Sequence, residues 1–310
     1  MDILSDILET IQLRGALYFH TDFSPPWGAA VPAHTRAARF HLVVQGHCHI
    51  ALPSGATVSL DAGDFILIPG GRAHILSDSP GVTAPPLEKI LEEAGYSGQG
   101  VLAFGEGDDQ ASTKMICGHF DFAPGADHRV LRALPEYVLV PACDRATRPW
   151  LDQPLRLLIS HVFSTQAGSA AAVSRLSEVV LIEAIRTGIE GAPQLNRLLE
   201  GFNDPQIGRA LALMHSEWAR SWTVEELASE VGMSRSIFAE RFKAITGCGP
   251  MTYLAEWRLQ KAKALLTNSA VSIGEVARLS GYRSASAFTR AFTSGFEQSP
   301  SAFRRGTELD

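Results

Sequence analysis

The sequence has few cysteines and lacks long apolar runs, and both shortages narrow the class of protein. Its four cysteines, Cys48, Cys117, Cys143 and Cys248, are widely spaced and form no CxxC pair. This spacing excludes a zinc-finger motif and a disulfide framework, and it suits a reducing compartment. Apolar stretches such as 179–182 are far shorter than the ~18–20 residues that a membrane-spanning helix needs.

The sequence also lacks a net positive charge and a basic N-terminus. Asp2 and Asp6 precede any basic residue, whereas secretory leaders begin with basic residues, so we expect a cytoplasmic protein. The formal net charge of −6 hides an asymmetry, because residues 205–306 hold 13 Lys and Arg against 8 Asp and Glu, net +5. The rest of the chain holds 14 against 25, net −11. A basic module on an acidic one indicates that one part approaches a polyanion such as DNA.

The first half of the chain has the pattern of an all-β domain. Seven short runs rich in β-formers are separated by turn residues and predict strands at 39–45, 48–52, 57–60, 65–68, 74–76, 114–122 and 138–139. Many short, closely spaced strands indicate a sandwich or barrel. The polar stretch 79–113 is too long for a hairpin turn. We interpret it as a mobile flap or insertion in which 87–94 forms a helical turn.

Two amphipathic helices are predicted after Pro149. Apolar residues recur at spacings of three and four over 151–162 and over 176–184, and Gly168 and Ser169 separate the two patterns. Such stripes either pack on the β domain or form a subunit interface. The sequence leaves both readings open.

An internal repeat occupies the last third of the chain. The segment 223–234 is echoed at 272–283, so that Gly232 returns as Gly281 at an offset of 49. Two phenylalanines and a proline return at an offset of 50, with Phe238, Phe242 and Pro250 matched by Phe288, Phe292 and Pro300. Each copy reads as a short helix, a tight turn and a second helix, which predicts two helix-turn-helix motifs. A repeated packing unit, as in a solenoid, is the alternative, but it needs three or more copies.

Capping residues and spacing define the second helix of each copy. Thr223 and Glu226 form a capping box, Ser234 caps the next helix, and Ser284 or Ser286 does so in the second copy. Because the phenylalanines face inward, the outward residues are Arg235, Ser236, Ala239, Glu240 and Lys243, and then Ala285, Ser286, Ala287, Thr289 and Arg290. Joined by the predicted helix 251–266, two such helices would meet successive major-groove faces of one duplex.

About a hundred residues at the C-terminal end carry a specific pattern. Its fixed positions are Phe242, Gly247, Pro250, Tyr253, Arg258, Ala262, Leu265, Leu266, Ile273, Val276, Ala277, Gly281, Tyr282, Phe288, Phe292, Pro300 and Phe303. This pattern resembles the DNA-binding domain of AraC/XylS-type transcription regulators. The resemblance implies base reading by Ser236, Ala239, Glu240, Ser286, Ala287, Thr289 and Arg290. Glu240 stands where the family usually has Arg, and Glu297 where it usually has Gly.

Basic residues of the same region are expected on DNA phosphates, or else on a solvated basic face. They are Lys243, Arg258, Lys261, Arg283, Arg304 and Arg305. Arg258 has a second reading as the partner in a structural salt bridge.

The β domain contains the pattern G(x)5PxGxxH, from Gly63 to His74. This fits the second motif of cupins, and the resemblance implies a cupin-like β-barrel. Arg39 stands where a metal-binding cupin places Glu, and only His34 remains of its paired histidines. By resemblance the strand face with Arg39 and His41 lines the barrel interior. Arg39, with His41 and His74, is therefore expected to receive an anionic or hydroxylated effector.

Three strands of one barrel could bring His41, His74 and Cys117 together. Two imidazoles and a thiol are zinc ligands, so the group is a candidate site for zinc or another divalent metal, and its thiolate could be oxidised. The alternative is a set of hydrogen-bonded histidines beside a buried cysteine. Because His119 shares a face with Cys117, and His47 and His49 flank Cys48, other groupings remain open.

Together these patterns predict an α+β multidomain chain with a cupin-like effector-sensing β-barrel (1–145), a helical bridge that could dimerise (146–204) and an all-α domain with two helix-turn-helix motifs (205–306). The expected function is sequence-specific regulation of transcription. We expect a homodimer that binds double-stranded promoter DNA, acts as an activator and has RNA polymerase as a further partner. The β-barrel is expected to sense a small molecule, a metal or an oxidant. One alternative is a cupin metalloenzyme, an isomerase or dioxygenase, with a fused DNA-binding tail. Another is an architectural DNA-binding protein whose barrel only dimerises.

Overall fold

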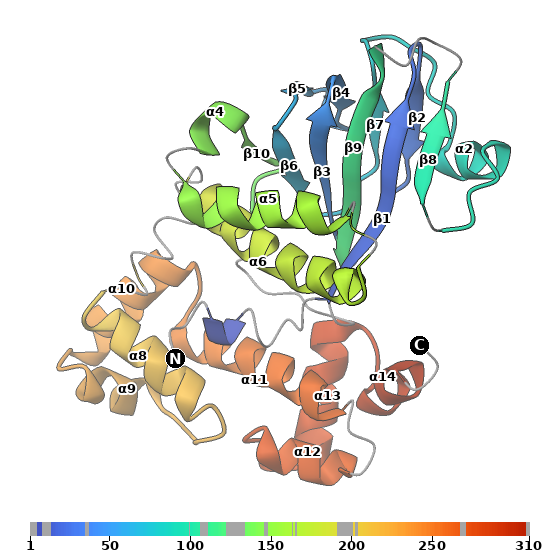
Figure 1. The fold of residues 1–310 in the computed structure, drawn as a ribbon. Helices are drawn as coiled ribbons and strands as arrows, with labels where there is room; N and C mark the ends of the chain where they lie inside the picture. The colour runs from blue at the N-terminus through green and yellow to red at the C-terminus, as the bar shows by residue number, and fades with distance from the viewer. Residues whose placement is uncertain are drawn as a thin grey trace. The chain divides into compact units, whose positions relative to one another are not determined.

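The computed structural model describes residues 5–7, 14–34, 37–98, 100–105, 111–121, 134–145, 148–162, 164, 166–190, 201, 204–266 and 271–307 (Figure 1). The described residues form two compact units. One extends from the first strand to residue 190, and the other holds residues 204–307 together with 5–7. No described helix is both long and apolar enough to cross a membrane.

Two β-sheets form the N-terminal unit. Its strands are β1 (Arg14–Phe23), β2 (Gly28–Val31), β3 (Ala37–Gln45), β4 (His47–Ala51), β5 (Thr57–Asp61), β6 (Phe65–Ile68), β7 (His74–Ser77), β8 (Val101–Phe104), β9 (Thr113–Asp121) and β10 (Val138–Val140). One sheet has the order β10-β6-β3-β9-β1-β8 and the other β2-β7-β4-β5. The strands enclose an apolar core that includes Trp27, Ile50 and Leu60. The predicted sheet-rich, cupin-like unit is confirmed.

All seven predicted strands are present, but three others were not predicted. These are β1, β2 and β8. The prediction of a mobile flap over 79–113 needs correction, although the helical turn predicted at 87–94 is present. Within that stretch α2 (Leu87–Glu93) buries Ile90 completely, and β8 buries Leu102 while pairing in parallel with β1. The segment contributes to the core because these two side chains can leave water only against the sheets.

Three helices follow the strands, and the longest of them packs on the six-stranded sheet. They are α4 (Ala142–Arg145), α5 (Pro149–Val162) and α6 (Ser169–Glu190). α5 lies beside α6, and α6 contacts β1 and β10 (Figure 1). The interpretation in which the apolar stripes pack on the β domain is therefore correct for α6, whereas α5 packs on α6. Trp150, Leu157 and Val179 are nevertheless 50%, 50% and 41% exposed, which leaves an apolar outer face.

The C-terminal unit consists of seven named helices among its described residues. They are α8 (Ile207–Ser216), α9 (Val224–Glu230), α10 (Arg235–Thr246), α11 (Pro250–Leu266), α12 (Ile273–Leu279), α13 (Ala285–Phe296) and α14 (Pro300–Thr307). The pairs α9–α10 and α12–α13 are the two predicted helix-turn-helix copies, and α11 contacts both. The four phenylalanines of the repeat are fully buried.

Local chemistry fixes the ends of these helices as the sequence predicts. Thr223 and Glu226 form the full capping box, and Ser284 rather than Ser286 caps α13. The turn glycine Gly281 has φ +71, and a Cβ there would lie 2.5 Å from the carbonyl oxygen of Ala219. Only glycine satisfies both the conformation and the close approach.

Residues 5–7 pack against the helices of the C-terminal unit. Ile7 is fully buried, and the Asp6 carboxylate lies 2.8 Å from Nδ1 of His215 and accepts a hydrogen bond of 2.6 Å from Nζ of Lys261. Burial raises the pKa of Asp6, but these two partners outweigh it and leave the pKa below its usual value. The carboxylate therefore stays charged and links the segment to α8 and α11.

Glu297 ends α13 at a strained position. Among the described residues it is the one non-glycine residue with positive φ, at +55°, and the matching residue of the first copy is Gly247. Its acidic side chain also lies at the negative end of the helix dipole. We expect Glu297→Gly to stabilise α13 by about 1 kcal/mol, because the left-handed conformation costs other residues ~1–2 kcal/mol. Amide hydrogen exchange of α13 in the full chain measures this, with Gly247→Ala, expected to destabilise α10, as the matched control. Faster exchange in Glu297→Gly would contradict the assignment of strain.

Candidate sensor pocket and nucleic-acid interface

Acidic partners engage two arginines near the first recognition helix, α10. Nε of Arg235 lies 2.5 Å from a carboxylate oxygen of Glu225, and Arg241 is paired with Asp204. Glu240 is exposed on the same helix. The surface of α10 is therefore close to neutral, although Lys243 is exposed and has no polar partner among the described residues.

The other predicted contacts of α10 are accessible. Ser236 is exposed and Ala239 is half-buried. Sequence reasoning missed Ile237, which is 59% exposed in the first turn. An apolar side chain in that place can contact a thymine methyl group in the major groove. Its position in the sequence, three residues after the Ser234 cap, could have identified it as a residue of the first helical turn.

The second recognition helix, α13, differs in charge. Arg290 is exposed, as is Arg283 just before the helix, and neither has an ion pair or hydrogen bond among the described residues. Ser286 is exposed, and Ala287 and Thr289 are half-buried beside it. Arg290 on the helix and Arg283 just before it thus present two unneutralised guanidinium groups beside small polar side chains.

Other basic residues are engaged inside the C-terminal unit. Arg258 donates to the carbonyl oxygens of Trp218 and Arg220, and Arg304 donates to those of Leu266 and Val271. Their guanidinium groups hold loops in place. Arg258 therefore has a structural role, but through main-chain hydrogen bonds and not through the salt bridge that the sequence suggested. Lys261 is bound to Asp6, while Arg305 is exposed and has no polar partner among the described residues.

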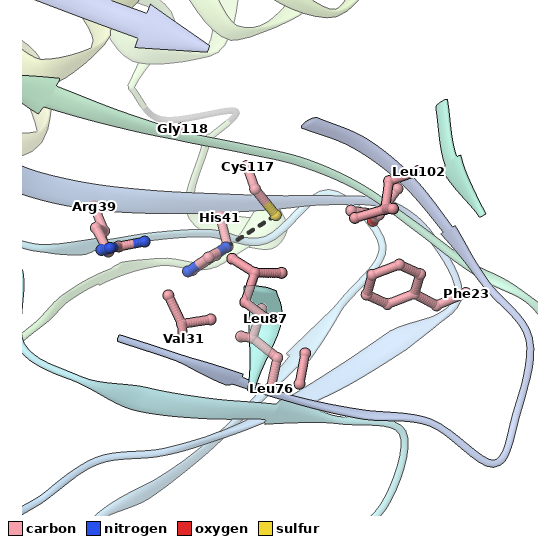
Figure 2. Close-up of a pocket in the computed structure, with 11 residues that line it drawn as sticks. Phe23, Val31, Arg39, His41, Leu76, Leu87, Leu102, Cys117 and Gly118 are labelled. Carbon is pink, nitrogen blue, oxygen red and sulfur yellow. Dashed lines mark hydrogen bonds between the residues drawn. The ribbon is translucent and has the colours of Figure 1, made fainter. Parts of the chain in front are cut away.

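The N-terminal unit contains a mostly apolar pocket between its two sheets (Figure 2). The pocket is partly open to solvent. Its lining consists of Thr21, Phe23, Ala29, Val31, Arg39, His41, Leu76, Leu87, Leu102, Cys117 and Gly118. Figure 2 shows Arg39 and His41 on the side away from Phe23. Only three of these residues, Arg39, His41 and Cys117, were singled out from the sequence, because the apolar wall comes from strands and a helix far apart in the chain.

The structure brings His41, His74 and Cys117 together as a row of hydrogen bonds. Nδ1 of His41 lies 3.0 Å from Sγ of Cys117, and Nε2 of His41 lies 2.8 Å from Nε2 of His74. Nδ1 of His74 lies 2.8 Å from the carbonyl oxygen of Arg72. Since a carbonyl only accepts, we assign the proton of His74 to Nδ1. It follows that His41 donates from Nε2 to His74 and that the Cys117 thiol donates to Nδ1 of His41.

Burial keeps every member of this row neutral. It lowers the pKa of His41 well below its usual value, an effect to which His74 and Arg39 add, and it lowers the pKa of His74 to about 4. It also raises the pKa of the Cys117 thiol. A protonated, buried thiol is a poor nucleophile. Cys117 and His74 contact opposite nitrogens of His41, so a metal bound by these residues would replace hydrogen bonds of the row.

A cupin-type metal centre does not fit the residues present. The place of the metal-binding glutamate is taken by Arg39, a buried cation that has no lone pair to give a metal. We therefore assign no metal-dependent chemistry to a centre of this type.

Comparison with known families and proteins agrees with both units. A family described as "Cupin" matches residues 2–190, and a family described as "Helix-turn-helix domain" matches residues 227–306. A putative AraC-like transcription regulator of Streptomyces lividans is 30% identical over 307 residues, which cover 98% of each chain. The chain belongs to the AraC-like transcription regulators. It is a DNA-binding regulator with an N-terminal cupin domain.

Two further similarities extend over different lengths of this AraC-like chain. The HTH-type transcriptional regulator AlkR of Acinetobacter baylyi is 29% identical over 309 residues, covering 98% of this chain and 99% of AlkR. The solved DNA-binding domain of AdpA, in complex with a target DNA, is 33% identical over 34% of this chain and 95% of that domain, with a TM-score of 0.33. The named relatives are regulators rather than enzymes.

The stability of the cupin unit in this AraC-like regulator should depend on pH. His41 and His74 are neutral when folded, whereas unfolded histidines take up protons below about pH 6.5. The unfolded state then binds more protons, so stability is full above about pH 6.5 and declines toward about pH 4, by roughly 1 kcal/mol or more. Amide hydrogen exchange of β3 and β9 across this range measures the decline. It should be shallower in His74→Gln and unchanged in His49→Gln, a histidine outside the row, and equal slopes in all three proteins would refute this assignment.

Proposed function

We propose that α10 and α13 enter successive major grooves of promoter DNA and that Arg290 on α13, with Arg283 just before it, supplies most of the electrostatic attraction at the grooves. In the first helix the base-reading residues are Ser236, Ile237, Ala239 and Glu240, and in the second they are Ser286, Ala287, Thr289 and Arg290. The observation that supports this proposal is the difference in charge between the surroundings of the two helices. Arg235 is occupied by Glu225, whereas Arg283 and Arg290 are exposed and free of polar partners among the described residues.

Phosphate contacts fall to Lys243, Arg283 and Arg305 in this proposal. Each has an exposed charged side chain. Arg258 and Arg304 donate hydrogen bonds to main-chain carbonyl oxygens, so their substitution would damage the fold. Arg235 can reach DNA only after leaving Glu225, a surface pair worth ~0–1 kcal/mol, so its contribution is smaller.

Substitution of Arg290 and Arg283 separates base reading from phosphate binding. We expect Arg290→Ala to cost about 1–3 kcal/mol on the preferred duplex and to relax preference at one base position. Arg283→Ala should weaken all duplexes alike and reduce the salt slope by about one. Titration of the full chain against a selected duplex and its single-base variants, at several salt concentrations, measures both effects. Equal loss on every duplex for Arg290→Ala would contradict base reading.

The cupin domain acts, in this proposal, as a sensor of a small, mostly apolar molecule with an anionic or hydroxyl group. Arg39 is 5% exposed and is the one permanent cation among the residues that line the pocket. A ligand oxygen at Arg39 gains a charge-assisted hydrogen bond in a low-dielectric site, and the ligand's apolar part replaces water against Phe23, Leu76 and Leu102. A coupling of ~1–3 kcal/mol to DNA binding would make a useful switch.

Small carboxylates test the sensor assignment. A panel such as benzoate, hexanoate and octanoate should include a member that raises the melting temperature of the full chain and changes its affinity for the preferred duplex. The matching methyl ester should have a weaker effect, and Arg39→Gln should abolish the response while retaining DNA binding. His49→Gln on β4 is the matched control that keeps the response. If carboxylate and ester act equally, Arg39 does not recognise the head group.

The remaining assignments concern the location, the oligomeric state and the partners of the protein. We infer that the chain is a cytoplasmic homodimer and not an enzyme, and that RNA polymerase is a further partner at activated promoters. The exposed Trp150 and Leu157, two turns apart on α5, favour pairing through the outer face of α5 and α6. Sedimentation equilibrium should then give twice the mass of one chain.

A further inference from the structure

A second group of polar side chains lies at the end of β9, outside the row of hydrogen bonds. His119 and Asp121 are two residues apart on this strand and therefore point to the same side. His34 comes from the segment between β2 and β3, and Ala37 of β3 pairs with Asp121. Two segments far apart in sequence thus bring two imidazoles and one carboxylate together.

The distances within this group suit a metal ion. Nε2 of His119 lies 3.0 Å from one oxygen of Asp121, and Nε2 of His34 lies 3.8 Å from the other. One ligand atom from each of the three residues lies within 4.8 Å of the others. Zinc binds nitrogen and oxygen at about 2.0–2.2 Å, so donors around a tetrahedral ion are about 3.3–3.5 Å apart. The observed distances lie on either side of this value, so small side-chain rotations would complete the site.

The surroundings of the group favour an accessible site. The side chains of His34 and Asp121 are 40% and 47% exposed, and that of His119 is 12% exposed. The rings of His34 and His119 stack with centroids 5.5 Å apart, so both histidines are already ordered beside the carboxylate. Arg39, paired with His119 in the β3–β9 ladder, opposes a cation, and the charge of Asp121 offsets it.

We propose that His34, His119 and Asp121 bind one divalent cation of the zinc class, with a fourth position open to water. The ion would join the segment before β3 to the end of β9, the strand that also carries Cys117. This site differs from the predicted group of His41, His74 and Cys117. It also differs from the cupin pattern, because two of its three ligands come from β9. The inference goes beyond the proposed recognition of DNA and of a carboxylate.

Zinc titration of the full chain, monitored by competition with a chromophoric chelator, tests the proposal. One equivalent should bind tightly, and His34→Gln, His119→Gln and Asp121→Asn should each weaken binding at least roughly 100-fold, more than loss of an indirect partner does. His49→Gln is the matched control and should bind as the natural chain does. Because His34 is half-exposed, His34→Gln decides the matter if the other variants lose the fold, as judged by circular dichroism and DNA binding.

Cobalt(II) distinguishes this site from the other histidine group. The proposed nitrogen and oxygen ligands predict visible ligand-field bands without a sulfur-to-cobalt charge-transfer band, and Cys117→Ser should leave the spectrum unchanged. A charge-transfer band that disappears in Cys117→Ser would assign the metal to His41, His74 and Cys117 and overturn the proposal. Absence of zinc binding, or unchanged binding in His34→Gln and His119→Gln, would overturn it as well. None of these outcomes bears on DNA recognition, which the Arg290 and Arg283 variants test separately.

Discussion

The pairing of β3 with β9 is the constraint on which the sensor unit depends. In this antiparallel ladder Arg39 lies opposite His119, and His41 lies opposite Cys117. Because side chains alternate along a strand, all four belong to one face, and a slip of one residue would turn them to the other. β9 is also paired with β1 along its other edge, so its register is held from both sides. The cation of the pocket and the neutral row beside it follow from this register.

The buried imidazoles and the thiol of the pocket are compatible with an apolar core because each donates its proton to an acceptor in the row. An unpaired imidazole or thiol would incur a desolvation penalty there. The row from Cys117 through His41 to His74 ends on the carbonyl oxygen of Arg72, which fixes every tautomer without placing a charge in the core. Arg39 cannot become neutral in this way. The pocket therefore combines apolar walls, neutral polar groups and one permanent cation, and the proposed recognition of a carboxylate rests on this combination.

The sequence predicts local features of the fold better than features that depend on distant partners. The capping box at Thr223, the paired phenylalanines and the strand bounds of β3 to β7 follow from spacing and short-range chemistry. β8 escapes prediction because four residues in a polar stretch become a strand only by pairing with β1, some eighty residues earlier. The sequence places Arg39 and His41 on one face of a strand. It does not reveal the wall of Leu87 and Leu102, nor the acidic partners that neutralise Arg235 and Arg241.

The two helix-turn-helix copies share a framework but have diverged in what they present. Both use a capped helix, a turn glycine and two buried phenylalanines, so their recognition helices are held alike. In the first copy Glu225 and Asp204 hold the nearby arginines, and the exposed face carries Ser236, Ile237 and Glu240. In the second copy Arg283 and Arg290 face solvent without polar partners among the described residues. In the proposed mode of binding, both copies contact bases, and the exposed arginines of the second copy add an attraction to the phosphate backbone that does not depend on sequence. The first copy, whose nearby arginines are already paired, then depends more on the match between its short side chains, its carboxylate and the bases.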